Sequence, residues 1–210
     1  ERDAAGNWSA SGFFDIHVDT ILPTASITAP TTLGPVWLTT NTPIVAWNED
    51  GTGTNPTSTL EIDSGTGFAG VTHTNGQALQ TPLSDGRHYL RINVTDEANN
   101  QAYSTVVTID VDTDTPVVNI TAPTTEWSTT NQPTLSWTVT SNDGNSYTET
   151  AFYNTTNELV NQVSGQPTVS ALPDGSVVLR VEAEDLAGNV GFDEYTIKVD
   201  TDIPSVALNQ

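Results

Sequence analysis

Aspartate and asparagine residues recur in matched loops of this chain, and their oxygen atoms suit the binding of a hard cation. The segments 96–100 and 185–189 each follow an apolar run, and Val-Asp-Thr follows one strand later at Asp112 and Asp200. Ca²⁺ takes about six to eight oxygen ligands, whereas clustered carboxylates without a cation repel one another or bind protons. The pattern therefore predicts Ca²⁺ bound at the ends of repeated modules.

Two groups of ligands are expected, because the loops after the second and sixth strands of a seven-stranded sandwich lie at the pole where the preceding linker enters. The predicted ligands are Asp19, Glu49, Asp50, Asp96, Asn100, Asp112, Asp114, Asp143, Asp185 and Asn189. Two simpler interpretations stay open. Asp-x-Ala-Gly-Asn is also a turn sequence whose side chains bond their own backbone, and general acidity also keeps a surface protein solvated.

The sequence predicts no catalytic residues. Pairs such as Glu182 with Glu184, or Asp110 with Asp112, have strand spacing and are expected to share a face that points to solvent. The three histidines do not recur between copies, so a zinc site is not expected. No cysteine is present, which excludes disulfides and thiolate chemistry.

The charge balance narrows the possible partners. Asp and Glu number 26 against 5 Lys and Arg, which gives a formal net charge of −21. Such a chain repels nucleic acid and anionic membranes, and no apolar run approaches the length of a membrane helix. Cations are therefore the expected small partners, and Ca²⁺ is the expected cofactor.

The chain repeats itself with a period near one small β-sandwich module. Each Val-Asp-Thr is followed by a proline, and the three prolines, Pro23, Pro116 and Pro204, lie 93 and 88 residues apart. The turns Asp85-Gly86 and Asp174-Gly175 also match. Because the correspondence covers the whole chain, we interpret it as tandem modules.

Alternating apolar residues predict about seven strands in each repeat and no helix. His88, Leu90, Ile92 and Val94, for example, are expected on one buried face. The predicted strands lie near 25–29, 43–48, 57–63, 67–73, 77–82, 87–95 and 103–112, then near 117–121, 133–139, 147–154, 158–164, 168–172, 176–184 and 192–199.

Leu-x-Asp-Gly, Asp-x-Ala-Gly-Asn and Val-Asp-Thr-x-x-Pro together resemble the tandem bacterial Ig-like, fibronectin-III-like repeats of large extracellular adhesins. The resemblance implies an all-β chain of seven-stranded Ig-like sandwiches joined end to end, with modules at 21–113 and 114–201. It also implies an extracellular or cell-surface location. Many such repeats have tyrosine where this chain has His88 and Val177, so we do not expect a tyrosine-corner hydrogen bond there.

The two end segments are incomplete as modules. Residues 1–20 supply one loop and a last strand, and residues 202–210 supply only a first strand. We expect the chain to be a piece of a longer array. The alternative is donor-strand exchange, in which Phe14, Ile16 and Val18 complete the sandwich of an identical subunit.

Other side chains could mediate recognition or carry a modification. Trp37 and Trp127 occupy matched positions, and we expect them to pack against a first strand or between modules rather than to form a glycan platform. Four Asn-x-Ser/Thr sequences are candidate N-glycosylation sites, at Asn7, Asn93, Asn119 and Asn154. All four side chains are expected to face solvent.

The function that fits these patterns is a structural spacer or stalk in an extracellular or cell-surface protein. Linkers of two residues between Val-Asp-Thr and proline restrict bending, and Ca²⁺ would restrict it further. The partners are then neighbouring modules of the same chain or identical subunits. The alternatives are a self-assembling filament subunit and an adhesin module that binds a surface glycan or protein.

Overall fold

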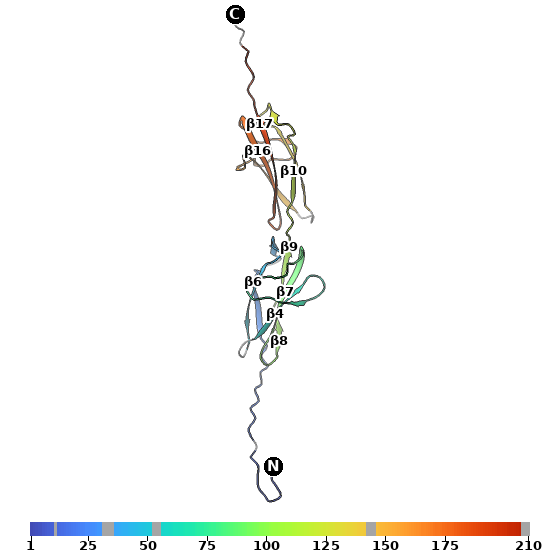
Figure 1. The fold of residues 1–210 in the computed structure, drawn as a ribbon, viewed down its shortest axis with the longest axis vertical. Helices are drawn as coiled ribbons and strands as arrows, with labels where there is room; N and C mark the ends of the chain where they lie inside the picture. The colour runs from blue at the N-terminus through green and yellow to red at the C-terminus, as the bar shows by residue number, and fades with distance from the viewer. Residues whose placement is uncertain (11, 31–35, 52–55, 142–145, 207–210) are drawn as a thin grey trace. The chain divides into compact units, whose positions relative to one another are not determined.

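The computed structural model describes residues 1–10, 12–30, 36–51, 56–141 and 146–206. The chain separates into two compact units, and its strands form two pairs of sheets, drawn from blue to green and from yellow to red in Figure 1. All regular elements in these residues are strands. Accordingly, the described part contains no helix that could cross a membrane.

The first pair of sheets is formed by strands between Thr24 and Val111. One sheet has the order β1-β3-β6 and the other has the order β2-β9-β7-β4-β5, with β8 paired to β7. We call this pair the first sandwich. Its strands are β1 (Thr24–Ala29), β2 (Val36–Leu38), β3 (Ile44–Asp50), β4 (Thr57–Asp63), β5 (Ala69–Val71), β6 (Gln77–Ala78), β7 (Gly86–Thr95), β8 (Gln101–Tyr103) and β9 (Val107–Val111).

The second pair of sheets, called the second sandwich, repeats this topology between Val117 and Val199. Its sheets have the orders β10-β12-β15 and β11-β17-β16-β13-β14. Its strands are β10 (Val117–Ala122), β11 (Trp127–Ser128), β12 (Thr134–Thr140), β13 (Tyr147–Tyr153), β14 (Asn157–Glu158), β15 (Gln166–Pro167), β16 (Gly175–Asp185) and β17 (Val190–Val199). The all-β, tandem-sandwich prediction is confirmed.

Strand alternation builds both cores as predicted. Leu90, Ile92 and Val94 of β7 are fully buried, and Leu179 and Val181 of β16 occupy the corresponding positions. Burying one such side chain contributes about 1.5–3 kcal/mol relative to leaving it exposed. A tryptophan on the facing sheet of each sandwich, Trp47 or Trp137, is also buried.

Several strands differ from the sequence prediction. The short strands β2 and β11 were not predicted, because two or three residues are too few for a visible alternation; each pairs in parallel with the last strand of its sandwich. The strand predicted near 158–164 shortens to β14, and in place of the strand predicted near 168–172 the structure has β15 two residues earlier. In this region the side chain of Gln162 bonds the backbone of Val163, Gln166, Pro167 and Val169.

In the first sandwich, His88 stands where many such repeats have tyrosine, and it makes an equivalent contact. A ring nitrogen of His88, Nε2, lies 2.7 Å from the carbonyl oxygen of Ser84, four residues upstream. His88 is 2% exposed. Imidazole therefore supplies, in this copy, a backbone hydrogen bond of the kind that a tyrosine hydroxyl makes in a tyrosine corner, although the residue is not tyrosine.

Candidate functional site

The Asp-x-Ala-Gly-Asn loop of the second sandwich is organised by one carboxylate. Oδ1 of Asp185 accepts hydrogen bonds from the backbone N–H groups of Ala187, Gly188 and Asn189, each at 2.9 Å. Its Oδ2 accepts a bond from Nδ2 of Asn189, also at 2.9 Å. The aspartate thus satisfies N–H donors that a tight turn would otherwise leave unpaired, as Asx turns do.

The other two copies of the loop form the same turn. Asp96 accepts from the backbone and the side chain of Asn100, at 2.8 and 2.9 Å, and Asp3 accepts in the same way from Asn7. The side-chain hydrogen bond from Asn7, followed by its backbone N–H, lowers the pKa of Asp3 below the ordinary value. The Asp3 copy forms outside both sandwiches, flanked by a bridge between Arg2 and Trp8, so the turn does not need a sandwich around it.

The asparagine that closes each turn also binds the segment that connects modules. Nδ2 of Asn100 donates to the carbonyl oxygen of Asp19 at 3.1 Å, and Nδ2 of Asn189 donates to the carbonyl oxygen of Asp112 at 2.9 Å. Both acceptors are the central residue of Val-Asp-Thr. The two motifs recur together along the sequence because their side chains and backbone meet in space.

The threonine of Val-Asp-Thr has its own fixed partner. The backbone N–H and the hydroxyl of Thr113 both donate to Oδ1 of Asp85 at 3.0 Å. Thr201 donates in the same way to Asp174, at 3.1 and 3.0 Å. Asp85 and Asp174 are the aspartates of the two Asp-Gly turns, so each turn fixes the chain as it leaves the last strand.

The remaining two residues of Val-Asp-Thr also have defined roles. Val111 and Val199 are each 1% exposed in the cores. The aspartate carboxylate then accepts from the backbone N–H two residues on, as Asp112 does from Asp114 at 3.2 Å. We call the Val-Asp-Thr segment, the aspartate of the Asp-Gly turn and the asparagine of the Asp-x-Ala-Gly-Asn loop the anchoring network.

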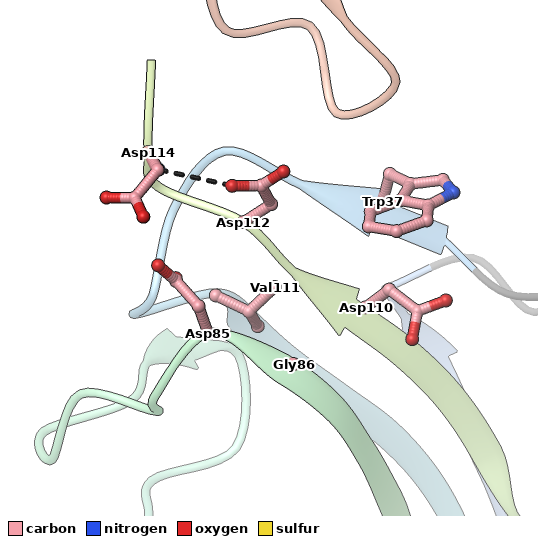
Figure 2. A pocket seen from close by; sticks show the side chains of 7 residues that line it. All are labelled: Trp37, Asp85, Gly86, Asp110, Val111, Asp112 and Asp114. Carbon is pink, nitrogen blue, oxygen red and sulfur yellow. Dashed lines mark hydrogen bonds between the residues drawn. The ribbon is translucent and has the colours of Figure 1, made fainter. Parts of the chain in front are cut away.

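A pocket lies beside this network at the end of β9. It is lined by Trp37, Asp85, Gly86, Asp110, Val111, Asp112 and Asp114, and Figure 2 shows the aspartate side chains on several sides of it. Asp110 and Asp112 are 4% and 3% exposed, so the expectation that this pair faces solvent was wrong. Two bonds from the Arg87 guanidinium to the Asp110 carboxylate, at 2.8 and 2.9 Å, explain how Asp110 is buried.

The predicted calcium ligands lie in three different settings. Asp96, Asn100, Asp185 and Asn189 belong to the turns described above, and Asp19, Asp112 and Asp114 belong to the linkers. Glu49 accepts a bond from the Trp47 indole N–H at 3.1 Å, Asp50 ends β3 in an exposed position, and Asp143 lies outside the described residues.

Within the described ranges, no three Asp, Glu or His side chains converge to hold one metal ion. Calcium binding stays a prediction.

The remaining candidates occupy varied positions. Asn93 and Asn7 donate their amide nitrogens to carboxylates, whereas Asn119 lies on β10 and Asn154 on an exposed turn. Phe14, Ile16 and Val18 are 89%, 77% and 80% exposed and belong to no strand, so the strand expected there is not formed. Donor-strand exchange by these residues stays a prediction.

Trp37 and Trp127 are both partly exposed, at 37% and 57%. The ammonium group of Lys198 lies 5.1 Å from the centre of the Trp127 ring, which is a cation–π distance. Lys198 also pairs with Glu126. At Trp127 an intramolecular cation therefore covers part of the surface that a glycan platform would need.

Sequence reasoning missed two parts of this site. It noted the Asp-Gly turns and the Val-Asp-Thr segments but not their contact, although both recur with the same period. It also did not single out Arg87. That residue has no counterpart in the second sandwich, where Ser176 follows the Asp-Gly turn in its place, so the repeat carried no signal for it.

Comparison with known proteins supports the fold. No family model and no curated protein sequence matches the chain. The fibronectin(III)-like modules of Clostridium thermocellum CbhA are 15% identical over 89% of this chain and 100% of theirs, with a TM-score of 0.52. Three N-terminal domains of the bacteriophage RB49 outer capsid protein Hoc are 9% identical over 87% of this chain and 71% of theirs, with a TM-score of 0.49.

A 1.5-MDa bacterial ice-binding adhesin is also similar, with 15% identity over 87% of this chain and 67% of its own and a TM-score of 0.37. Of the three likenesses, the one to the CbhA modules has the highest TM-score. It shows that the chain has the fold of tandem Ig-like, fibronectin-III-like sandwiches.

Proposed function

We propose that this chain is a load-bearing structural spacer in an extracellular or cell-surface protein. The observation that supports the proposal is the anchoring network, whose contact between threonine and the Asp-Gly aspartate is present at the end of both sandwiches. Thr113 and Thr201 each donate two hydrogen bonds to an aspartate of their own sandwich. A chain whose modules only had to be tethered would not need every residue of Val-Asp-Thr to be fixed.

The strand pairing beside the network supports the same role. The last strand of each sandwich, β9 or β17, pairs in parallel with the short strand β2 or β11. When the two ends of a sandwich are pulled apart, parallel strands near opposite chain ends must slide along each other, so their hydrogen bonds break together rather than one at a time. The proposal gives the chain no catalytic role, and its partners are neighbouring modules or identical subunits.

The net charge of −21 supports a surface location for the spacer. Like-charged chains repel one another and stay dispersed at high local density. Calcium is the second part of the proposal. It would bind carboxylates at the module ends, among which Asp112 and Asp114 lie beside the Trp37 pocket, and would reduce the repulsion there.

The spacer proposal is tested by measuring how widely the two sandwiches move. The chain has no cysteine, so spin labels can be placed at Thr66→Cys and Glu158→Cys, two exposed positions in different sandwiches. We expect a distance distribution as narrow as that of a label pair within one sandwich. Thr113→Val should broaden it. A broad distribution in the unmutated background would contradict the spacer proposal.

Calcium binding is tested by measuring the melting temperature of the same chain by calorimetry, first with millimolar Ca²⁺ and then with chelator. A ligand that binds only the folded state raises the melting temperature. We expect Ca²⁺, but not the same ionic strength of Na⁺, to raise it, and Asp112→Asn to reduce the effect. An unchanged melting temperature would remove calcium from the proposal and leave the spacer role intact.

A further inference from the structure

The four Asn-x-Ser/Thr sequences differ in what their amide nitrogens do. Nδ2 of Asn7 donates to Oδ2 of Asp3 at 2.9 Å, and Nδ2 of Asn93 donates to Oε1 of Glu61 at 3.1 Å. An N-linked glycan is joined to this nitrogen. A sugar on Asn7 or Asn93 would therefore have to displace a carboxylate that already accepts from the amide.

Asn119 is restricted by its backbone. It lies within β10, which pairs with β12 over its length and places Asn119 opposite Thr138. To enter the active site of a transferase, an acceptor segment must be free of its own sheet. The pairing of β10 with β12 opposes that movement, although the Asn119 side chain is exposed.

Asn154 donates its amide nitrogen to no carboxylate and lies just beyond the end of β13, where one backbone bond, from its N–H to the carbonyl oxygen of Val178 at 2.7 Å, ties it to β16. It lies in the turn that connects β13 to β14, and Asn154, Thr155 and Thr156 are all exposed. Its Oδ1 accepts a bond from the N–H of Val178 at 3.2 Å. Its Nδ2 makes no hydrogen bond among the described residues. The bond at Oδ1 holds the amide in place and leaves the reactive nitrogen directed away from that contact.

The backbone of this turn gives a second, independent argument. Asn154 has a φ of 49° and Thr155 a φ of 62°, and a β-branched residue in the left-handed region is strained. The corresponding turn of the first sandwich uses Gly65 and Gly67, both with a φ of 100°. The second sandwich keeps Thr155 where glycine would be less strained, so the strain falls within the acceptor sequence.

We propose that Asn154 is the N-glycosylation site of this chain. The donor is an oligosaccharide linked through a diphosphate to a polyprenyl lipid. In the reaction, Nδ2 forms a bond to C1 of the first sugar and loses a proton, the bond between C1 and the diphosphate oxygen breaks, and the polyprenyl diphosphate leaves. Thr156 supplies the hydroxyl of the acceptor sequence. This modification is additional to the spacer role and does not depend on it.

The test uses the folded, purified chain with an oligosaccharyltransferase and a polyprenyl-diphosphate oligosaccharide, followed by peptide mass mapping. We expect the Asn154 peptide to be at least ten times more occupied than the Asn7, Asn93 and Asn119 peptides. Thr156→Ala should abolish the modification while keeping Asn154 and its bond to Val178. Thr95→Ala, the matched change beside Asn93, should leave occupancy at Asn154 unchanged.

A synthetic peptide that contains Asn154-Thr155-Thr156 confirms that the enzyme accepts this sequence, and an unchanged melting temperature shows that Thr156→Ala is folded. Equal or greater occupancy at Asn93 or Asn119 in the folded chain would overturn the proposal. So would an unmodified Asn154 in the folded chain under conditions in which the peptide is modified.

Discussion

The last strand is continuous in the second sandwich and divided in the first. β17 pairs with β16 from Val190 to Val199, whereas the first sandwich has β8 and β9 with a gap between them. Ser104 lies in that gap and is buried. Its backbone N–H donates to the carbonyl oxygen of Ile92, and its hydroxyl oxygen accepts from the N–H of the same residue at 2.9 Å. A serine side chain thus replaces one ladder bond where the strand is interrupted.

This difference between the two last strands shows that the strand itself is less constrained than the segment that follows it. The ladder of the last strand tolerates an interruption because a hydroxyl can satisfy the same backbone group. The contact between threonine and aspartate in the anchoring network is present at both ends with the same atoms, through Asp85 with Thr113 and Asp174 with Thr201. The exit from each sandwich is therefore more constrained than the strand that leads to it.

The largest expected effect is at Gly191, where a Cβ would lie 1.7 Å from the carbonyl oxygen of Pro116. The matching residue of the first sandwich is Ala102. Because backbone must move to admit the methyl group, Gly191→Ala should destabilise the second sandwich by about 3 kcal/mol, the upper range of overpacking. Urea denaturation followed by fluorescence measures this.

Ala102→Gly is the matched control for that substitution. It removes a methyl group at the same register position and should cost only about 0.5–1 kcal/mol through backbone entropy. A loss from Gly191→Ala no larger than that of the control would show that the close approach to Pro116 is readily relieved.

The next largest loss of stability is expected at the asparagines of the anchoring network. Asn189 is 9% exposed and donates to both Asp185 and Asp112, whereas its counterpart Asn100 is more exposed. Asn189→Ala leaves two acceptors without a donor and should cost about 2 kcal/mol. Asn100→Ala should cost less. Equal losses in denaturant midpoint would mean that burial does not decide the contribution of this contact.

A smaller effect is expected at the core tryptophans. The indole N–H of Trp47 donates to Glu49 and Ser58, at 3.1 and 3.0 Å, while the buried Trp137 indole nitrogen has no acceptor among the described residues. Val139 stands where the first sandwich has Glu49. Glu49→Val should cost about 0.5–1 kcal/mol and speed hydrogen exchange of the Trp47 indole by NMR. An unchanged exchange rate would assign the protection to Ser58 alone.

The smallest effect concerns the turn after β4. The N–H groups of Gly67 and then Gly65 lower the pKa of Asp63 below its ordinary value of 3.8. A lowered pKa stabilises the fold above the unfolded pKa, and that contribution is lost as the pH falls through the folded pKa. NMR titration should place the Asp63 midpoint below 3.8 and show the Gly65 and Gly67 amides shifting with it.

The matching turn of the second sandwich provides the control for this titration. It uses Asn154, which carries no titratable group, so the amides of Thr155 and Thr156 should not shift over the same pH range. An Asp63 midpoint at or above 3.8 would contradict the two backbone hydrogen bonds as the cause.

Much of the fold could be predicted from the sequence, because strand alternation and tandem repetition are local patterns. The bounds predicted for 57–63 coincide with β4, and Leu90, Ile92 and Val94 are buried as expected. The strands that were missed, β2 and β11, have too few residues to show a period. Their strand character comes from parallel pairing with β9 and β17, and that partner is distant in sequence.

The sequence by itself determined the modules and the Asp-x-Ala-Gly-Asn turns, since the turn forms even at Asp3, outside both sandwiches. Only the tertiary structure decided which connecting segment each turn contacts. It brought Asn100 to Asp19 and Asn189 to Asp112, across separations of 81 and 77 residues. It also buried Asp110 against Arg87, a residue without a counterpart in the other copy. A local turn needs only neighbouring N–H donors, whereas these contacts depend on how the strands between them pack.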